Sequence, residues 1–316
     1  MKGRKKMKRK VLSKIVCIIL CLALVFSASL SASAAFKTGK AKKVDAIAHR
    51  GYSAFAPENT LSAFRLAGEK GFYGCEFDIR PTKDGVWVVH HDETVDRMTD
   101  GHGKISQLTY AELSKLKIDA GKNIENYPNE KVPTLEETLD VCEESSVRPV
   151  IEVKGGNPEN MEGLSKILKG RSFSNGYTII SFTWELLAEL RELLPESEIF
   201  MLAEEVMPSH VRFCFEHKID GISFKYTKNT SLSITLLKAT GLKTAAWTVD
   251  NVTSARKLCA LGVGTITTNR LLPEDLDMSN LPYGEVLKDA ANDLLNAVKS
   301  FFDSVKERFD NLFGKC

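Results

Sequence analysis

Short apolar runs alternate with longer stretches of helical period from residue 44 to residue 272. The runs have the length and composition of strands, and the longer stretches place apolar residues three and four positions apart. The pattern predicts strands at residues 46–49, 74–79, 149–153, 178–182, 199–203, 221–224, 244–249 and 264–268. It predicts helices at residues 60–70, 135–145, 161–168, 184–194, 208–217, 231–239 and 252–261. Strands that alternate with helices are typical of a parallel sheet, so we predict an α/β fold, the closed (β/α)8 TIM barrel.

An open, doubly wound sheet is the alternative fold. That architecture carries a glycine-rich phosphate-binding loop after its first strand. No such loop follows residues 46–49. The barrel is therefore the preferred prediction.

Residues 75–92 are predicted to form a hairpin that turns at residues 84–85, an Asp-Gly pair. The return strand follows too short a loop to run parallel, so we expect an antiparallel ribbon. Because side chains in a strand alternate between faces, Glu76 and Asp78 project to the same side. The hairpin thus presents an acidic pair on one face.

The length of the turn decides which histidine joins that face. A two-residue turn places Asp78 opposite His91, whereas a three-residue loop brings His90 round instead. The Asp-Gly pair favours the shorter turn, so we predict that His91 shares a face with the acidic pair.

Residues 93–132 are too long for an ordinary connection between a strand and a helix. Residues 109–113 are the one short helix predicted there. We expect a small inserted lobe after the second strand that caps the mouth of the barrel and shapes substrate access.

The first 34 residues have the three regions of a secretory signal peptide. Residues 1–14 carry eight Lys or Arg and no acid, residues 15–26 are apolar, and Ala32-Ser33-Ala34 supplies small residues for cleavage. The apolar run is short for a membrane span, so a retained anchor is the less favoured alternative. We expect an exported protein, secreted or associated with the cell envelope, whose leader is cleaved near Ala34.

Composition changes this picture in two respects. The chain has 316 residues, 43% of them hydrophobic, which suits one large domain or two small ones. Its leader holds eight of the 43 Lys and Arg and none of the 41 Asp and Glu, so the remainder has a formal charge of −6. The basic balance belongs to the leader, and we expect no nucleic-acid partner.

Five of the seven cysteines lie beyond the leader, and no two of them are spaced as CxxC. An odd number without that spacing indicates neither a disulfide framework nor a zinc site. Four of the five lie in predicted strands or helices, where we expect small buried apolar side chains.

Residues 279–316 follow the last strand and place apolar residues in a single stripe at helical period. The stripe predicts an amphipathic helical tail. We expect this helix to pack on the barrel or on a second copy. Contact with a membrane surface is the alternative, which Phe301, Phe302 and Phe309 of the stripe suit.

The chemistry is expected at the carboxyl ends of the strands, where barrels of this type carry their functional groups. Those ends bring together one histidine, several carboxylates and several cations, and the hairpin adds a second histidine. The predicted site residues are His49, Arg50, Glu76, Asp78, His91, Glu152, Lys154 and Trp247.

Glu76, Asp78 and Glu152 offer only hard oxygen ligands, which select Mg²⁺ or Ca²⁺ over zinc or copper. Arg50 and Lys154 flank them. A cation held by carboxylates beside Arg and Lys is what an anionic phosphoryl group requires. These five residues predict one divalent cation and a phosphate-binding site.

His49 and His91 can then act as an acid/base pair, in which one activates the attacking oxygen and the other protonates the leaving alkoxide. Together the residues predict metal-assisted phosphodiester cleavage. Simpler interpretations exist: His49 can be a structural strand-end residue, and Trp247 can be barrel core rather than an apolar wall for substrate. Residues 57–60 start a helix, and the sequence leaves open whether Glu58 also braces Arg50.

Seven short motifs occur in a fixed order along the barrel: His49-Arg50-Gly51, Pro57-Glu58-Asn59-Thr60, Glu76-Phe77-Asp78, Thr82-Lys83-Asp84-Gly85, His91-Asp92, Ile151-Glu152-Val153-Lys154 and Trp247-Thr248-Val249. No tripeptide among them is specific, but seven in sequence are not expected by chance. In order and spacing they resemble the glycerophosphodiester phosphodiesterase family, over residues 44–272.

The resemblance implies a (β/α)8 barrel with a small inserted lobe and a divalent cation held by the three carboxylates. It implies that His49 and His91 catalyse the reaction and that Arg50 and Lys154 contact the phosphate. The implied products are sn-glycerol 3-phosphate and an alcohol. Members of the family also act on lysophospholipids or wall polymers, so the leaving group stays open.

Three functions are therefore weighed. The first is hydrolysis of soluble glycerophosphodiesters. The second is a phospholipase of the lysophospholipase D or phosphoinositide type, which would make better use of the amphipathic tail. The third, a non-catalytic surface protein that binds a phosphorylated ligand, would be supported by a missing ligand or histidine, and none is missing.

Overall fold

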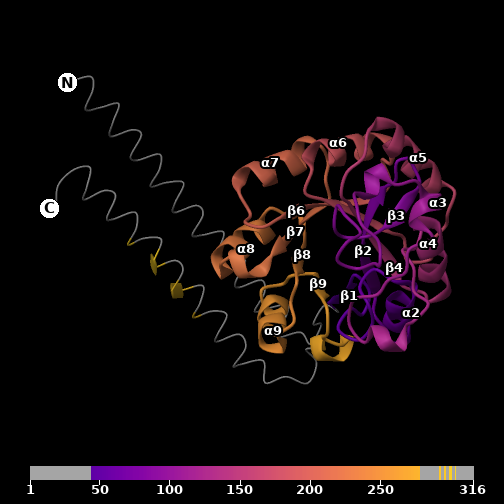
Figure 1. Ribbon diagram of the computed structural model, residues 1–316. Coiled ribbons are helices and arrows are strands. Elements are labelled where there is room, and N and C mark those ends of the chain that lie inside the picture. Colours follow the sequence, from indigo (N-terminus) through magenta and orange to yellow (C-terminus); the bar gives the residue numbers. More distant parts are fainter. Residues whose placement is uncertain (1–43, 278–291, 293–294, 297–298, 301–302, 304–316) are drawn as a thin grey trace, which may run out of the picture.

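The structure, a computed structural model, describes residues 44–277 and six further residues between 292 and 303 (Figure 1). The expected signal peptide, residues 1–34, lies outside the described residues. So does most of the expected helical tail, residues 279–316. The description that follows concerns the part between them.

Eight parallel strands close into a barrel (Figure 1). The first strand pairs with the second and also with the last, which closes the sheet. The (β/α)8 prediction is confirmed. The strands are β1 (Asp45–His49), β2 (Gly74–Pro81), β4 (Arg148–Val153), β5 (Thr178–Ser181), β6 (Glu198–Ala203), β7 (Gly221–Lys225), β8 (Lys243–Trp247) and β9 (Thr265–Thr268).

Seven helices of the described part surround this barrel, as Figure 1 shows. Most begin at a Thr or Asn whose side-chain oxygen accepts a backbone N–H in the first turn, as in the capping box at Thr134. The helices are α2 (Leu61–Glu69), α4 (Leu135–Glu144), α5 (Pro158–Lys169), α6 (Trp184–Leu193), α7 (Pro208–Glu216), α8 (Ser231–Ala239) and α9 (Val252–Ala260).

The strands bury both faces. Their outward side chains pack with the helices in the main hydrophobic core, which includes Phe77, Ile151 and Phe224. Their inward side chains fill the barrel with a smaller cluster, which includes Ile47 and Phe200. Burial on two faces explains why the strands read as continuous apolar runs in the sequence.

The hairpin is present, but the predicted turn is wrong. Strand β3 (Trp87–Val89) runs antiparallel to β2 and pairs Ile79 with Val89, a register that leaves three residues in the loop. The Thr82 hydroxyl favours the longer loop, because it accepts the Val86 N–H at 3.0 Å. Gly85, with φ 81°, supplies the left-handed residue that such loops require.

Residues between the hairpin and α4 have a hydrophobic cluster of their own, built from Val88, Val95, Met98, Ile105, Leu113, Ile118 and Val132. They include α3 (Tyr110–Leu113) and the short 3₁₀ turns η1 (Ile105–Gln107) and η2 (Ile124–Asn126). Because Val88 lies on β3, this cluster packs the inserted segment onto the hairpin. Residues 93–132 are called the lobe below.

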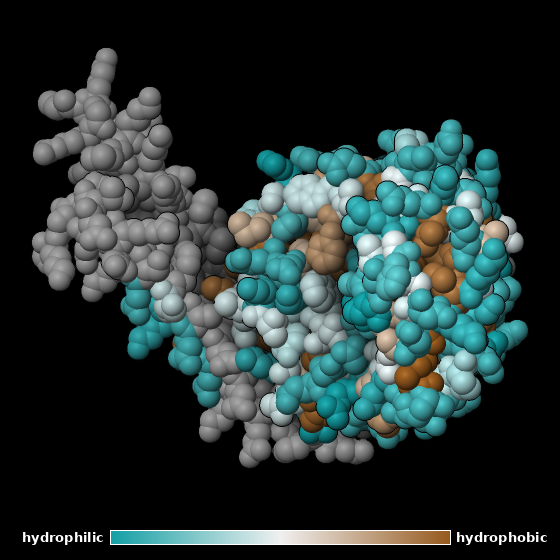
Figure 2. Space-filling model, viewed as in Figure 1, coloured by the Kyte–Doolittle hydropathy of each residue, from teal (hydrophilic) through white to brown (hydrophobic). Residues whose placement is uncertain are grey.

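Two further 3₁₀ turns, η3 (Tyr226–Lys228) and η4 (Pro273–Leu276), follow β7 and β9. Among the described residues, no helix is long and apolar enough to cross a membrane. Hydrophilic residues cover most of the face in Figure 2, with hydrophobic residues in separate patches. The four described cysteines, Cys75, Cys142, Cys214 and Cys259, are free and buried, as expected.

Candidate active site

Three carboxylates meet at the mouth of the barrel. Glu76 and Asp78 alternate along β2, and Glu152 is the register partner of Asp78 on β4. One oxygen atom from each lies within 4.8 Å of the others. Glu76 and Asp78 are buried, and the Glu152 side chain is 12% exposed. The structure thus brings together the three residues that the sequence nominated as metal ligands.

Two cations pair with this cluster. The Lys154 ammonium lies 2.6 Å from Glu152 Oε1 and 3.1 Å from Asp78 Oδ1. Arg50 Nε lies 3.5 Å from Asp78 Oδ2 on the other side. Three carboxylates against two cations leave a negative charge at the mouth when all five are ionised.

The backbone after β1 is shaped around Glu76. Arg50 and Gly51 both adopt left-handed conformations, with φ of 56° and 76°. The Arg50 N–H therefore donates to Glu76 Oε2 at 3.0 Å. A Cβ at Gly51 would lie 2.7 Å from the carbonyl carbon of Ala63, so this approach to α2 requires glycine. A non-glycine residue in this conformation costs about 1–3 kcal/mol, a strain typical of functional sites.

The helix-start segment has two roles that the sequence left open or missed. Thr60 is the N-cap of α2. Glu58 does brace Arg50, with Oε1 2.9 Å from Nη1. Asn59 is buried instead of capping, and its amide donates to Asp78 Oδ2 at 2.8 Å. The contact of Asn59 with Asp78 was not predicted, because the helix-start sequence gives no local signal for it.

The carboxylate cluster has the properties of a cation site. Burial and the neighbouring carboxylates raise the pKa of Glu76 well above its usual range and that of Glu152 to about 7. Burial also disfavours ionised Asp78, but Lys154 and Arg50 outweigh it and lower its pKa. Glu76 Oε1 is buried and without a hydrogen-bond partner. A divalent cation among the three would satisfy that oxygen and let all three carboxylates ionise, so the residues fit a metal.

His49, at the end of β1, is held from the barrel. Its Nδ1–H donates to Asn269 Oδ1 at 2.7 Å, and the Asn269 amide donates to Asp250 Oδ2 at 2.6 Å. This chain fixes the tautomer, so Nε2 faces the site 3.9 Å from Glu76 Oε2. Burial and the charge of Arg50 lower the pKa of His49.

His91 is held from the hairpin side. Its Nδ1–H donates to Asp92 Oδ1 at 2.7 Å, and the Arg80 guanidinium donates twice to the His91 carbonyl, at 2.9 and 3.0 Å. Burial lowers the pKa of His91, while the charge of Asp78 and the hydrogen bond to Asp92 act in the opposite direction. Nε2 is again the nitrogen left for proton transfer.

The neighbouring His90 is buried and has other partners than His91. Its backbone N–H donates to the Asp78 carbonyl, and its ring is only 3% exposed. The ring Nδ1–H donates to the Asp92 carbonyl at 3.2 Å. The histidine whose charge acts on Asp78 is His91. The hairpin register differs from the predicted one, but β3 ends at Val89 and the chain turns after it, which changes the positions of the two histidines.

Trp247 lies at the end of β8, on the part of the rim away from the carboxylates. Its indole N–H donates to the Ser223 carbonyl, and the edge-to-face ring of Phe182 lies 5.8 Å away. Lys225 Nζ is 5.7 Å from the Trp247 ring centroid. Phe182 is 45% exposed. Trp247 packs against the hydrophobic cluster inside the barrel, and its role as an apolar wall for substrate stays a prediction.

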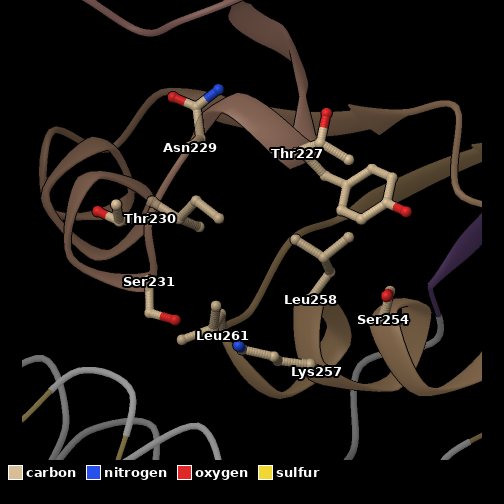
Figure 3. Close-up of a pocket in the computed structure, with 10 residues that line it drawn as sticks. Thr227, Asn229, Thr230, Ser231, Ser254, Lys257, Leu258 and Leu261 are labelled. Carbon is tan, nitrogen blue, oxygen red and sulfur yellow. The ribbon is translucent and has the colours of Figure 1, made fainter. Parts of the chain in front are cut away.

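Two other cavities are lined by none of the predicted site residues. One of about 370 Å³ lies between the start of α8 and α9, where Thr230, Ser254 and Lys257 surround Leu258 (Figure 3). Another of about 530 Å³ is lined by residues at the amino ends of the strands, including Arg148 and Glu198. The first has no carboxylate or histidine in its lining, and the second lies at the amino ends of the strands, opposite the end where barrels of this type carry their functional groups. The carboxylate mouth is therefore the candidate catalytic site.

The fold and this mouth define a (β/α)8-barrel enzyme. Residues 49–272 match the model of the glycerophosphoryl diester phosphodiesterase family, and the chain belongs to that family.

Similar proteins agree with this assignment. The chain is 35% identical to a glycerophosphodiester phosphodiesterase of Caldanaerobacter subterraneus over 230 residues, which cover 71% of this chain and 93% of that protein. It is 40% identical to human glycerophosphodiester phosphodiesterase 1 over 152 residues, 48% of this chain and 46% of that protein. A phosphodiesterase of Oleispira antarctica, solved with the product sn-glycerol-3-phosphate, superposes with a TM-score of 0.68 at 26% identity and covers 80% of this chain and 99% of its own.

Proposed function

We propose that this protein hydrolyses glycerophosphodiesters to sn-glycerol 3-phosphate and an alcohol. One observation carries the proposal: three carboxylate oxygens lie within 4.8 Å of one another, with Arg50 and Lys154 beside them. The family assignment and the product bound by the Oleispira protein support the choice of substrate.

The residues of the chain divide the work by charge. Arg50 and Lys154 bind the anionic phosphate oxygens and orient the diester. His49 and His91 each present Nε2, because a hydrogen bond holds Nδ1, so one can take a proton from the attacking oxygen and the other can protonate the leaving alkoxide. Trp247 supplies an apolar wall for the part of the substrate that is not phosphate.

Glu76, Asp78 and Glu152 would hold one divalent cation, Ca²⁺ or Mg²⁺, since all three offer hard oxygen ligands. When bound, the cation neutralises charge on the phosphoryl group and polarises it. The dication would also offset the negative charge of the carboxylate cluster, which would otherwise repel the phosphodiester anion.

The test is release of sn-glycerol 3-phosphate from glycerophosphocholine by the purified protein, with Ca²⁺ or Mg²⁺ added after chelator treatment. We expect turnover that chelation removes and the cation restores. Matched Glu152→Gln protein should stay inactive at the same cation concentration. Turnover that persists unchanged without any divalent cation would contradict the metal assignment.

A second substrate class is favoured by one observation. Phe182, edge-to-face with Trp247, leaves 45% of its surface exposed at the mouth. The acyl chain of a lysophospholipid, the substrate of a lysophospholipase D, would contact these rings. Phe182→Ala should then lower turnover of micellar lysophospholipid by about tenfold and leave that of glycerophosphocholine within twofold, whereas equal effects on both would count against this class.

We also propose that residues 1–34 direct export and are removed near Ala34, and that residues 279–316 form a helix that contacts a membrane surface or a second copy. The sequence pattern supports both statements. Intact-mass measurement of the exported protein tests the first. Cosedimentation with liposomes tests the second, and equal sedimentation of a variant truncated at residue 278 would contradict a membrane role.

A further inference from the structure

Arg97, in the lobe, joins two acidic side chains that come from different parts of the chain. Its Nε lies 2.5 Å from Asp92 Oδ2 and its Nη2 lies 2.6 Å from Glu58 Oε1. Both contacts raise the pKa of Arg97 further above its ordinary value. The side chain is 47% exposed, so the two ion pairs hold it at the edge of the site rather than inside it.

Each of these acids also contacts a residue of the proposed machinery. Asp92 uses its other oxygen, Oδ1, to accept the Nδ1–H of His91 at 2.7 Å. Glu58 accepts from Arg50 Nη1 at 2.9 Å. The guanidinium of Arg97 therefore lies between Asp92, which holds His91, and Glu58, which holds Arg50.

The geometry gives Arg97 a mechanical role. A carboxylate that accepts a donor on each oxygen cannot rotate freely, and a fixed carboxylate fixes the plane of the imidazole it holds. Glu58 follows β1 and belongs to the barrel, whereas His91 and Asp92 follow β3. Arg97 thus ties the side chain that holds His91 to the segment after β1, and it adds to the hydrogen bonds by which Arg80 on β2 holds the His91 carbonyl.

Arg97 also has an electrostatic role. The charged groups that act on His91 are Asp78, Asp92, Arg50 and Lys154. The guanidinium partly neutralises Asp92. Without it, Asp92 would attract the His91 proton more strongly, and a group near an unopposed carboxylate is more easily protonated.

We propose that Arg97 is a positioning residue that, braced by Glu58, orients His91 through Asp92. This inference rests on the proposed function for its effect on turnover. Its effect on His91 itself does not depend on any substrate.

The experiment compares Arg97→Gln and Arg97→Lys with Lys104→Gln in the full-length protein with saturating Mg²⁺. Lys104 is the matched control, because it pairs with Glu93 in the same lobe at 2.7 Å, is 49% exposed, and contacts neither acid. We expect Arg97→Gln to lower kcat for glycerophosphocholine by about 10- to 100-fold, the size of a lost charged hydrogen bond. KM should change less than threefold, because Arg50 still forms its ion pairs with Glu58 and Asp78. Arg97→Lys should recover part of kcat, since an ammonium can hold one carboxylate but lacks the planar fork.

A second measurement is independent of turnover. Imidazole resonances in ¹⁵N NMR titrations report the pKa of His91, which should rise by about 0.5 unit or more in Arg97→Gln and stay unchanged in Lys104→Gln. A kcat within twofold of the Lys104→Gln value, or an unmoved His91 pKa, would overturn the proposal. If the unaltered protein hydrolyses no glycerophosphodiester, the proposed function fails, and the titration still decides the role of Arg97.

Discussion

The two histidines of the site are held in contrasting ways. His49 belongs to the barrel, and its partner Asn269 is a neutral amide fixed by Asp250. His91 lies just outside the hairpin, and its partner Asp92 is a carboxylate fixed by the half-exposed Arg97. One imidazole is thus positioned by the core of the fold and the other by charges at its edge.

This difference separates their chemistry. Burial and then the charge of Arg50 lower the pKa of His49, although its hydrogen bond to Asn269 acts in the opposite direction, so His49 suits the role of base. A carboxylate beside His91 stabilises the imidazolium form, as in catalytic triads, so His91 suits the role of acid. It also makes the His91 side more sensitive to salt, because partly exposed ion pairs are screened.

The largest expected effect on turnover comes from removing either histidine. His49→Ala and His91→Ala should each lower kcat for glycerophosphocholine by about 10²- to 10⁴-fold, the usual contribution of an acid or base. His90→Ala is the matched control, since the His90 ring is buried and its Nδ1–H donates to the Asp92 carbonyl. Full activity in His91→Ala together with loss in His90→Ala would show that the two neighbours have been assigned the wrong way round.

A second prediction compares the two residues that hold the histidines, Asp92 and Asn269. Asp92→Asn should cost kcat roughly 10- to 150-fold, because the bond it weakens is charge-assisted. Asn269→Ala removes a bond between neutral groups and should cost about 3- to 10-fold. Steady-state kinetics with circular dichroism as a check on folding would measure both, and a larger loss in Asn269→Ala would reverse our view of the two sides.

A third prediction tests the acid and base roles with a better leaving group. An aryl phosphodiester of glycerol releases a phenol that needs little protonation. The loss caused by His91→Ala should therefore shrink by about tenfold or more on this substrate, while the loss in His49→Ala should not. If the two variants are rescued equally, the assignment of the acid to His91 fails.

The smallest expected effect concerns stability on the barrel side. The pKa of Glu152 in the cation-free folded protein is raised to about 7 from an ordinary value of 4.5. The unfolded chain therefore loses this proton at lower pH than the folded one, so the stabilising effect is complete below about pH 4.5 and is lost as the pH rises through 7.

In chelator, Tm should thus fall by on the order of 5 °C between pH 5 and pH 8, and Mg²⁺ should abolish the fall. Glu152→Gln should reduce the fall without removing it, because the pKa of Glu76 is also raised, whereas Lys104→Gln in the lobe should leave the slope unchanged. Calorimetry would measure this, and a Tm that rises over the same interval in chelator would contradict the raised pKa.

Much of the fold and the centre of the site follow from the sequence. Burial on two faces made each barrel strand a visible apolar run, and strict alternation put Glu76 and Asp78 on one side. Since the carboxyl ends of parallel strands meet at one rim, Glu152 and Lys154 could be placed beside them without coordinates.

Only the tertiary structure decided the rest. The Asp-Gly pair favoured a two-residue turn, but the Thr82 hydroxyl and the contact of Asp84 with the Tyr110 N–H in the lobe hold a three-residue loop. The roles of Asn59 and Arg97 were likewise hidden, because each depends on a partner far away in the chain. Periodicity records which face of an element is buried, whereas a hydrogen bond between loops depends on where distant segments finally pack.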